Sequence, residues 1–570
     1  MKFLNRILIV SLLAVMSVGC DDLFELDLLD NPNAVTAENA GVDFLYNNIQ
    51  LEFRNVYHNM HFIADGLVRH TTMGAFTYVE ALPSTTGNGI WNNTYADLFP
   101  DVDALVELAE SRGLDVHAGT AKLMKAYAMM GLVDMFGDVP FSQALQGTDV
   151  ISPGVDSGAD IYAAAEALID EAIAQLSGTN AASPAVDNYY GGNVDNWVTL
   201  GNTLKLRIGA TTRLIGGGSK ITAAVSTGDI IDSASEDFQF NYSNNRSNPD
   251  SRHPFYPNHY ESGDGTYMGN YYMWVMRLEK ELDGGPVDPR IRFYFNRQVS
   301  TSRDHDVNVY SCILSDEPDP AETPSYYLSV DPNMPYCVAS DDGYYGRDHG
   351  NGSGIPPDGP IRTLYGLFPG GGKWDNNDFK EGCCQNGGVD GALGEGIAPI
   401  LTSYMVDFMR AEAAATGATS EDARALLESG VRGSIAKVRT FASKISQAEL
   451  DHVIATAPQV VTAEVLLTDD DDVEEYVSYV LDQYDNASDK LDVIMKEFYI
   501  ACAGNSYEVF NFYRRTGKPN NMQPGIDQAI GPFARSLLYP ADNVNLNANV
   551  SQKPDLQQLV FWDDGSAMLR

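Results

Sequence analysis

The chain has 570 residues, of which 44% are hydrophobic, and this composition excludes an intrinsically disordered acidic chain. Its 37 basic residues against 78 acidic residues leave a formal net charge of −41, so a phosphate backbone would be repelled and no nucleic-acid partner is expected. With 30 tyrosines, 23 phenylalanines and 51 glycines, the composition favours a wet recognition surface set among many turns.

The N-terminus has the form of a secretory signal peptide, which we place at residues 1–19. Two basic residues precede an apolar run from Ile7 to Val18 that is too short for a comfortable membrane span. The small residues before Cys20 are similar to the site at which bacterial lipoproteins are processed and lipidated, and the two aspartates that follow resemble a surface-export signal of Bacteroidetes-type bacteria. We therefore expect lipidation at Cys20, a tether over 20–34 and one body over 35–570. An ordinary signal peptide followed by an unmodified cysteine is the alternative.

Apolar residues recur at helical spacing in two parts of the body, about 35–240 and about 396–520. Successive amphipathic helices of this kind must stack on a neighbour to bury their apolar faces, which predicts a scaffold of helix pairs. One helix from Asn193 is predicted to end at Gly216-Gly217-Gly218. Further helices are predicted around Thr120–Phe136, Ile161–Leu176, Tyr404–Ala411, Ala423–Leu427 and Leu491–Ala501.

The stretch of about 241–395 has a different texture, because glycine, proline, asparagine, aspartate and tyrosine dominate over any periodicity. One helix near Tyr267–Leu282 interrupts it, and the spacing of Trp274 on that helix favours a core position. Long irregular stretches are usually binding elements or disorder, and the aromatic content disfavours disorder. We therefore predict an ordered, loop-rich lobe that binds a ligand, beside a mainly α-helical scaffold with few short strands.

Four of the remaining cysteines lie in this lobe, and one or two disulfides among them would clamp it in an oxidising compartment. Adjacent cysteines are strained when they form a disulfide with each other, so we expect Cys383 and Cys384 to pair with different partners. The number is odd and the connectivity stays open. Zinc is not expected, since no C-x-x-C pair is present. The five cysteines are Cys312, Cys337, Cys383, Cys384 and Cys502.

Several short strings carry a family resemblance, in order along the chain. They are Asp134–Phe141, Trp197 with Asn202–Arg207, Asp288-Pro289-Arg290, Gly354–Asp358, Gly366–Lys373, Ala411-Glu412-Ala413 and Arg514–Gly517. Together with the lipoprotein start, they resemble the SusD/RagB-like nutrient-binding lipoproteins of the outer membrane. The resemblance implies four tetratricopeptide-like helix pairs beside an irregular lobe that holds the ligand site. It also implies a SusC-like TonB-dependent transporter as the partner, on which the protein acts as a lid.

Some of these strings also have plain structural interpretations. Phe136–Pro140 fits a helix stop, because Gly137 can adopt a positive φ and a proline cannot continue the helix. Arg514-Arg515 is most simply a pair that holds nearby carboxylates. The acidic run Asp469–Asp472 favours a solvated helix start, with a structural calcium ion as the alternative. No other cofactor is expected.

No motif supports catalysis. The sequence contains neither an H-E-x-x-H site nor a P-loop nor a G-x-S-x-G nucleophile elbow. Paired carboxylates could hydrolyse glycosides, but in so acidic a chain their presence decides nothing. We therefore do not expect an enzyme, and a surface glycoside hydrolase is the weaker alternative.

The sequence supports ligand binding better than it supports catalysis. A sugar ring offers apolar faces to an aromatic plane and hydroxyl edges to polar side chains. We expect such pairs of aromatic and polar residues in loops. For Trp91 a core position is an equal alternative. The candidate ligand-binding residues are Trp91 with Asn92 and Asn93, Tyr344 and Tyr345 with Arg347, and Trp374 with Asp375.

These observations predict a lipoprotein on the extracellular face of the outer membrane that captures oligosaccharides and delivers them to a SusC-like transporter. A few stacking contacts of about 1 kcal/mol each give weak, reversible binding, which suits a protein that passes its cargo on. The alternative is the same architecture binding peptides, as RagB-like members imply, through a groove and backbone hydrogen bonds.

Overall fold

The computed structural model describes residues 41–263, 266–301, 323–340, 342–352, 362–379, 388–446 and 470–570. The predictions for the signal peptide, Cys20 and the tether lie outside these residues. Within the described ranges, no helix is both long and apolar enough to cross a membrane.

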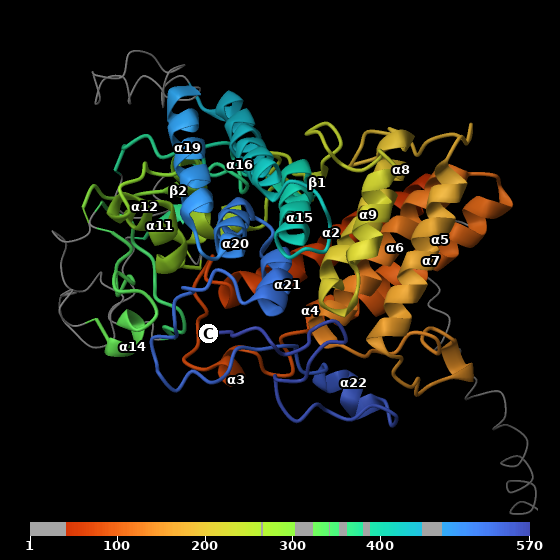
Figure 1. Cartoon of the computed structure of the whole chain (residues 1–570). Coiled ribbons are helices and arrows are strands. Elements are labelled where there is room, and N and C mark those ends of the chain that lie inside the picture. Colours follow the sequence, from red (N-terminus) through yellow and green to blue (C-terminus); the bar gives the residue numbers. More distant parts are fainter. Residues whose placement is uncertain are drawn as a thin grey trace, which may run out of the picture.

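The first half of the chain forms a stack of long helices. They are α2 (Val42–Leu67), α5 (Phe99–Ser111), α6 (Asp115–Phe136), α7 (Gly158–Leu176), α8 (Val194–Thr211) and α9 (Gly218–Ser226). Helices α5 to α9 lie side by side, each against its chain neighbour (Figure 1). Of the apolar residues at helical spacing on α7, Ile161, Ala165, Ala172 and Leu176 are buried and Leu168 is half-buried. The Ser157 side chain caps this helix by accepting from the N–H of Asp160 at 3.1 Å.

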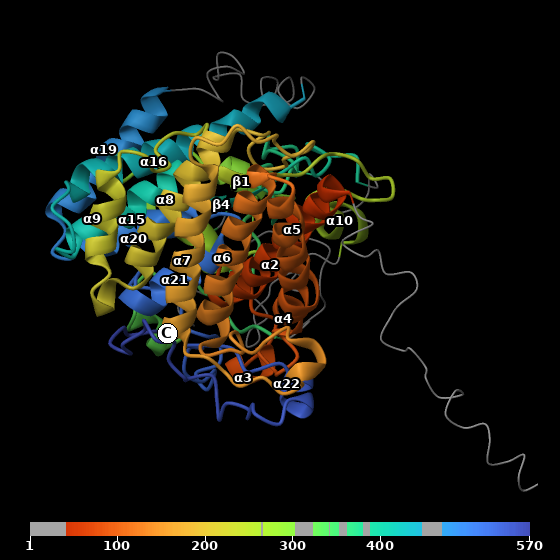
Figure 2. The ribbon, with the colours of Figure 1, turned by 90° about the vertical axis from the view of Figure 1, so that its right-hand side faces the viewer.

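A second group of helices comes from the C-terminal part of the chain. It comprises α15 (Ser403–Ala415), α16 (Ala423–Arg439), α19 (Asp470–Asn486), α20 (Lys490–Ala501) and α21 (Ser506–Thr516). Helix α21 packs against α2, so the two helical groups share one core. Figure 2 shows α6 and α7 upright, with the end of the chain running beneath them.

The remaining elements are short. The helices are α3 (Tyr78–Ala81), α4 (Asn88–Asn92), α10 (Phe255–Pro257), α11 (Asn270–Met276), α12 (Leu278–Leu282), α13 (Ile291–Tyr294), α14 (Ser325–Leu328) and α22 (Ala541–Leu546), with single turns at η1 (Asn93–Leu98), η2 (Gly147–Asp149), η3 (Arg213–Ile215), η4 (Asn258–Ser262) and η7 (Thr440–Lys444). Strand β1 (Phe238–Asn241) pairs antiparallel with β4 (Ile397–Leu401), and β2 (Phe295–Asn296) with β3 (Leu364–Tyr365). The predicted fold class, mainly helical with few short strands, is confirmed. The boundaries between scaffold and lobe stay a prediction.

One predicted helix end is confirmed, and a second lies earlier than predicted. Helix α6 ends at Phe136, and Gly137 follows with φ 78° while its N–H still bonds to the carbonyl of Val133. After α8 the chain makes the single turn η3, and this turn ends at Gly216, where φ is 100°. Glycine adopts these positive φ values at little cost, which explains why α6 ends at Gly137 and the turn η3 at Gly216, whereas α8 itself already ends at Thr211.

The single helix predicted over Tyr267–Leu282 is wrong. Helix α11 begins only at Asn270, and a break at Arg277 separates it from α12. The late start has a cause in the backbone pairing, because the N–H of Thr72 donates to the carbonyl of Tyr267 at 2.9 Å and the N–H of Gly269 to that of His70 at 3.0 Å, which holds residues 267–269 extended. Trp274 is buried in the core, as its spacing predicted.

Buried ion pairs tie the helices together, and the family-like strings supply most of them. Arg207 of α8 contacts Glu508 of α21 at 3.1 Å, and Arg515 contacts Glu412 of α15 at 2.7 Å. In the irregular part, Arg290 contacts Asp288 at 2.6 Å. The role predicted for Arg515 is confirmed.

Its neighbour Arg514 does not make the carboxylate contact that was predicted for it. In the described part of the chain Arg514 forms no ion pair, and its guanidinium lies 3.9 Å from the ring centroid of Phe510 and 4.7 Å from that of Trp562. Burial lowers the pKa of Arg514 to about 10. A buried guanidinium held by aromatic faces and backbone carbonyls replaces the predicted carboxylate contact.

The acidic run and the cysteines follow expectation in part. Helix α19 begins at Asp470, whose side chain is 97% exposed, so the run does form a solvated helix start. Cys337 forms a disulfide whose partner lies outside the described residues, and Cys502 is a buried free thiol.

Candidate functional site

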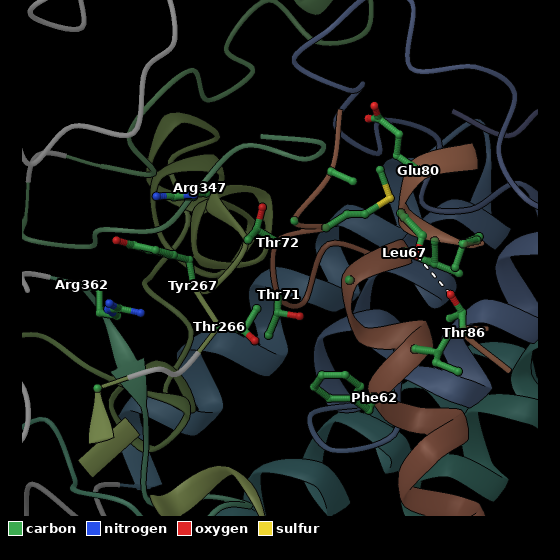
Figure 3. A pocket seen from close by; sticks show the side chains of 18 residues that line it. Phe62, Leu67, Thr71, Thr72, Glu80, Thr86, Thr266, Tyr267, Arg347 and Arg362 are labelled. Carbon is green, nitrogen blue, oxygen red and sulfur yellow. Dashed lines mark hydrogen bonds between the residues drawn. The ribbon is translucent and has the colours of Figure 1, made fainter. Parts of the chain in front are cut away.

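A pocket of about 750 Å³ opens where the C-terminal end of α2 meets the irregular part of the chain (Figure 3). Its walls come from the last turns of α2, residues 71–75, the segment 80–86 around α3, residues 266–267, and two arginines, Arg347 and Arg362. The pocket therefore combines a rigid helix with loops from distant parts of the chain.

Backbone hydrogen bonds join three of these segments side by side. The N–H of Thr72 donates to the carbonyl of Tyr267 at 2.9 Å, and the N–H of Arg347 donates to the carbonyl of Met268 at 3.0 Å. The segment of Tyr267 thus lies between the other two. This pairing sets the positions of the side chains that enter the pocket.

Tyr267 lies between two guanidinium groups. The Cζ of Arg347 is 4.1 Å from the centroid of its ring and the Cζ of Arg362 is 4.3 Å from it, and Figure 3 shows the two arginines on either side of the ring. Cation–π contacts of this kind stabilise by about 0.5–1 kcal/mol each at exposed sites and by more when desolvated. Two positive charges are therefore held in place at one end of the pocket.

Asp348, which follows Arg347 in the sequence, anchors the loop that carries Arg347. Its buried carboxylate accepts hydrogen bonds from the N–H of Cys337 at 2.7 Å and from the amides of Asn270 and Gln523 at 2.9 Å each. Burial raises the pKa of Asp348. Because these donors come from three separate segments and Cys337 is also disulfide-bonded, the backbone beside Arg347 is firmly fixed.

The opposite wall carries an aromatic side chain and hydroxyl groups. Phe62 projects from α2 with 51% of its surface exposed, and its ring packs behind on Phe255 at 6.0 Å. Figure 3 places it across the pocket from Tyr267. Threonines line the space between them, and the hydroxyls of two of them donate to backbone carbonyls, Thr72 to that of Asp348 at 3.2 Å and Thr86 to that of Ala81 at 3.4 Å. The four are Thr71, Thr72, Thr86 and Thr266. An exposed ring next to polar side chains matches what a sugar ring offers on its face and edges.

The predicted Trp91 is a core residue rather than an open platform. It lies on α4 with 9% of its surface exposed, packed edge-on against Phe136 at 5.3 Å and tilted against Tyr95 at 4.8 Å. Asn92 is exposed and Asn93 half-buried, and neither they nor Trp91 lines the pocket. Of the two alternatives for Trp91, the structure supports the core position.

The other predicted aromatics are buried as well, which corrects the expectation that their faces are open. Guanidiniums cover them: Arg292 lies 4.5 Å from the ring centroid of Trp374, and Arg297 lies 5.0 Å from that of Tyr344. Arg297 also donates to the carboxylate of Asp375 at 2.5 Å. The physical cause is that the loops fold over these rings. Tyr344, Tyr345 and Trp374 are each at most 3% exposed and Asp375 is fully buried.

Of the eight predicted ligand-binding residues, Arg347 alone lines the pocket. The structure does bring Tyr344, Trp374 and Asp375 together, but around the half-buried Arg292 and Arg297. Their proposed contact with a ligand stays a prediction, and the pocket is the stronger candidate.

A serine, a histidine and an aspartate meet in the interior without the arrangement of a hydrolase. Ser506 Oγ lies 2.5 Å from Asp65 Oδ1 and 2.9 Å from His70 Nδ1, while His70 Nε2 lies 3.2 Å from the carbonyl oxygen of Tyr499. In a catalytic triad the aspartate and the serine contact opposite ring nitrogens, whereas here the serine contacts both partners on one side. Burial lowers the pKa of His70 to about 3 and raises that of Asp65 to about 6. This cluster is structural.

Among the described residues, no group of three or more histidine, cysteine, aspartate or glutamate side chains is placed to hold a metal ion. The structural calcium ion suggested by the acidic run stays a prediction.

Two family models match the chain. The model described as "Starch-binding associating with outer membrane" matches residues 32–330, and the model described as "Susd and RagB outer membrane lipoprotein" matches residues 398–566. The chain belongs to the SusD-like family. No curated protein matches it.

Solved structures of SusD-like proteins share the fold. A SusD/RagB family protein from Bacteroides thetaiotaomicron is 19% identical with a TM-score of 0.62, over 92% of this chain and 100% of that one. A SusD homologue from Bacteroides fragilis is 17% identical with a TM-score of 0.62, again over 92% and 100%. A chitin-binding SusD homologue from Flavobacterium johnsoniae is 17% identical with a TM-score of 0.60, over 92% and 98%.

Sequence reasoning missed most of the residues that line the pocket of this SusD-like chain. Phe62 carried a usable signal, because it is a large aromatic residue off the apolar stripe of a helix whose other large aromatics are mostly buried. Tyr267 was assigned to a helix that begins three residues later. No local pattern marks Arg362, whose role depends on contacts between distant segments.

Proposed function

We propose that this SusD-like protein captures oligosaccharides in the pocket between Phe62 and Tyr267 and delivers them to a SusC-like TonB-dependent transporter. The observation that carries the proposal is the exposed ring of Phe62 on the wall of a pocket of about 750 Å³ that is otherwise lined largely by threonine, glycine and arginine residues. A volume of this size accommodates a few sugar units. Family membership and the existence of a chitin-binding homologue support a carbohydrate ligand.

The proposed role is binding without catalysis, from the extracellular face of the outer membrane. A lipid on Cys20 would hold the body there, and the description of the family as outer-membrane lipoproteins supports that location. Weak binding fits delivery, because a ligand held by one stacking contact and a few hydrogen bonds dissociates readily enough to enter the transporter.

The test is Phe62→Ala. Losing one stacking contact lowers affinity by roughly 3- to 10-fold, while the half-exposed ring contributes little to folding. Isothermal titration calorimetry against chitin oligosaccharides, starch and polygalacturonate would identify a binder among them, and the same titration with the variant should show the loss at an unchanged Tm.

The matched control is Phe44→Ala, which removes a 68% exposed phenylalanine from the other end of the same helix. It should bind as the native chain does. Equal binding by the native chain and Phe62→Ala would remove this pocket from the proposal, and no binding to any glycan would overturn the proposal itself.

A further inference from the structure

A single residue with an unusual backbone conformation joins α2 to the pocket wall. Arg69 follows the end of α2 with a φ of 68°, in the left-handed region that non-glycine residues rarely adopt. The wall residues Thr71 and Thr72 begin two residues later. Such a conformation persists only where the surroundings hold it, and it is frequent at ligand clamps. The conformation of Arg69 therefore sets the direction in which the wall leaves the helix.

The Arg69 side chain provides this hold. It belongs to a residue that is 1% exposed, and its guanidinium donates four hydrogen bonds from a planar fork of fixed geometry. The acceptors are the main-chain oxygens of Leu67 at 2.6 Å, Gln523 at 3.0 Å and Arg570 at 2.6 Å, and the hydroxyl of Tyr78 at 3.3 Å. One buried side chain thus joins the end of α2 to α3 and to two segments of the C-terminal part of the chain.

These contacts place two walls of the pocket relative to each other. Tyr78 is the first residue of α3, and Glu80 and Ala81 of the same helix line the pocket. On the other side, the carbonyl oxygen of Arg69 lies so close to Gly269 that a Cβ there would be 2.0 Å from it. Gly269 belongs to the segment that pairs with the wall, so a displacement of Arg69 would change the spacing of both walls.

The segment that accepts from Arg69 is itself fixed. The N–H of Arg570 donates to the hydroxyl of Tyr513 on α21 at 3.0 Å, and the hydroxyl of Tyr78 donates to the main-chain oxygen of Arg570 at 3.3 Å. The guanidinium of Arg570 also donates to the carbonyl of Asn520. Because α21 packs against α2, residue 570 is a rigid acceptor on the same core as the helix that precedes Arg69.

We infer that Arg69 is a positioning residue of the pocket, whose side-chain contacts hold residues 71–75 in the orientation that binds the ligand. Arg69 does not line the pocket itself, so it acts through the wall and not on the ligand. Loss of its contacts would let the backbone return to the common region of negative φ and turn the wall out of its place beside Phe62. The inference rests on the proposed function and names a residue on which that pocket depends.

The main variant is Arg69→Lys, which keeps the positive charge and replaces the planar fork by a single ammonium group. Hydrogen exchange, measured by mass spectrometry on peptides from 66–75, reports the opening of the wall without any ligand. These peptides should exchange about tenfold faster than in the native chain while peptides of α7 stay unchanged, because about one charge-assisted hydrogen bond is lost. Titration with chitin oligosaccharides should show an affinity lower by about the same factor.

The matched control is Arg514→Lys. Arg514 is also fully buried and donates to a main-chain carbonyl, that of Arg535. None of its hydrogen-bond or ring partners lines the pocket. Both lysine variants should lower the Tm, whereas the control should leave the exchange of 66–75 and the glycan affinity unchanged at temperatures well below its Tm. The comparison separates a positioning role from the general cost of altering a buried arginine.

Tyr78→Phe is a second test, which does not depend on whether the fold tolerates lysine at position 69. It removes the hydroxyl that accepts from Arg69 and leaves the guanidinium with its three main-chain acceptors. We expect changes of about threefold in the same two measurements, the size of one neutral hydrogen bond.

Three results would overturn the inference: unchanged exchange of 66–75 in both variants, faster exchange along the whole chain, or a native affinity in spite of a faster-exchanging wall. In each of them Arg69 would only stabilise the fold. The two measurements also separate the inference from the proposed function. Absence of glycan binding by the native chain would overturn glycan capture, whereas faster exchange confined to the wall would still support its positioning by Arg69.

Discussion

Asp134 shows how one buried carboxylate organises its surroundings. It accepts from the hydroxyls of Tyr162 and Tyr507 at 2.5 Å each and from the indole N–H of Trp562 at 2.9 Å, and the guanidinium of Arg207 lies 3.5 Å away. Asp134→Asn would turn an amide N–H₂ toward these donors and leave the charge of Arg207 less compensated. We expect a loss of about 3–5 kcal/mol in the free energy of unfolding, measured by urea denaturation.

The control for this change lies four residues further along. Asp138 is exposed and accepts the N–H of Gly158 at 2.8 Å through Oδ1, and an asparagine oxygen can accept the same bond. Asp138→Asn should therefore cost less than about 1 kcal/mol. Similar losses for both variants would show that the hydrogen-bond network around Asp134 does not hold the fold together.

At this scale, sequence reasoning found important residues but misjudged several roles. The family-like strings contain Asp134, Arg207, Glu412 and Arg515, which proved to be buried ion-pair and hydrogen-bond partners. The expected ligand aromatics failed because exposure depends on which loop covers a ring, and a ring such as Trp374 under Arg292 has no local sequence signature. Only Arg347 was both predicted and placed in the pocket.

At the scale of elements, the pocket wall depends on a close approach of backbones. Gly269 sits where two segments meet, and a Cβ there would lie 2.0 Å from the carbonyl oxygen of Arg69. Gly269→Ala must separate the segments that carry Thr72 and Tyr267. We expect a loss of about 1–3 kcal/mol in stability from overpacking, together with weakened glycan binding under conditions where the variant is folded.

Gly74 is the matched control, since it also lines the pocket and nothing lies within 4 Å of a Cβ built on it. Gly74→Ala should leave the Tm within a few degrees of the native value, measured by differential scanning calorimetry. If both alanine variants behave alike, the contact at Gly269 does not position the wall.

The contrast between the helices and the pocket wall explains which parts of the structure could be predicted from the sequence. Helices such as α7 and α8 follow from local periodicity and from capping residues, so the sequence alone located them. The wall forms by pairing residues near 71, 268 and 347, and no local rule specifies such distant partners. The irregular texture of that region predicted loops correctly, without predicting which loops meet.

At the scale of the whole molecule, burial of neutral histidines links stability to pH. Burial lowers the pKa of six of the nine histidines, in several cases to about 3. Below about pH 6.5 the unfolded chain therefore binds protons that the folded chain does not, and stability decreases as pH falls, by up to about 1.4 kcal/mol per pH unit for each histidine. The six are His58, His61, His70, His253, His259 and His349.

Two carboxyls act in the opposite direction. Burial raises the pKa of Asp65 to about 6, and desolvation with the nearby carboxylates of Asp101 and Asp97 raises that of the half-buried Glu52 to about 8, so the folded chain protonates both first. As pH falls, these two carboxyls offset only part of the loss of stability that the six histidines cause. Urea denaturation should therefore give a lower free energy of unfolding at about pH 5 than at about pH 7. In His58→Gln the slope of the unfolding free energy against pH should decrease by about 1.4 kcal/mol per pH unit, which corresponds to one proton. An unchanged slope would mean that His58 is already charged in the folded protein.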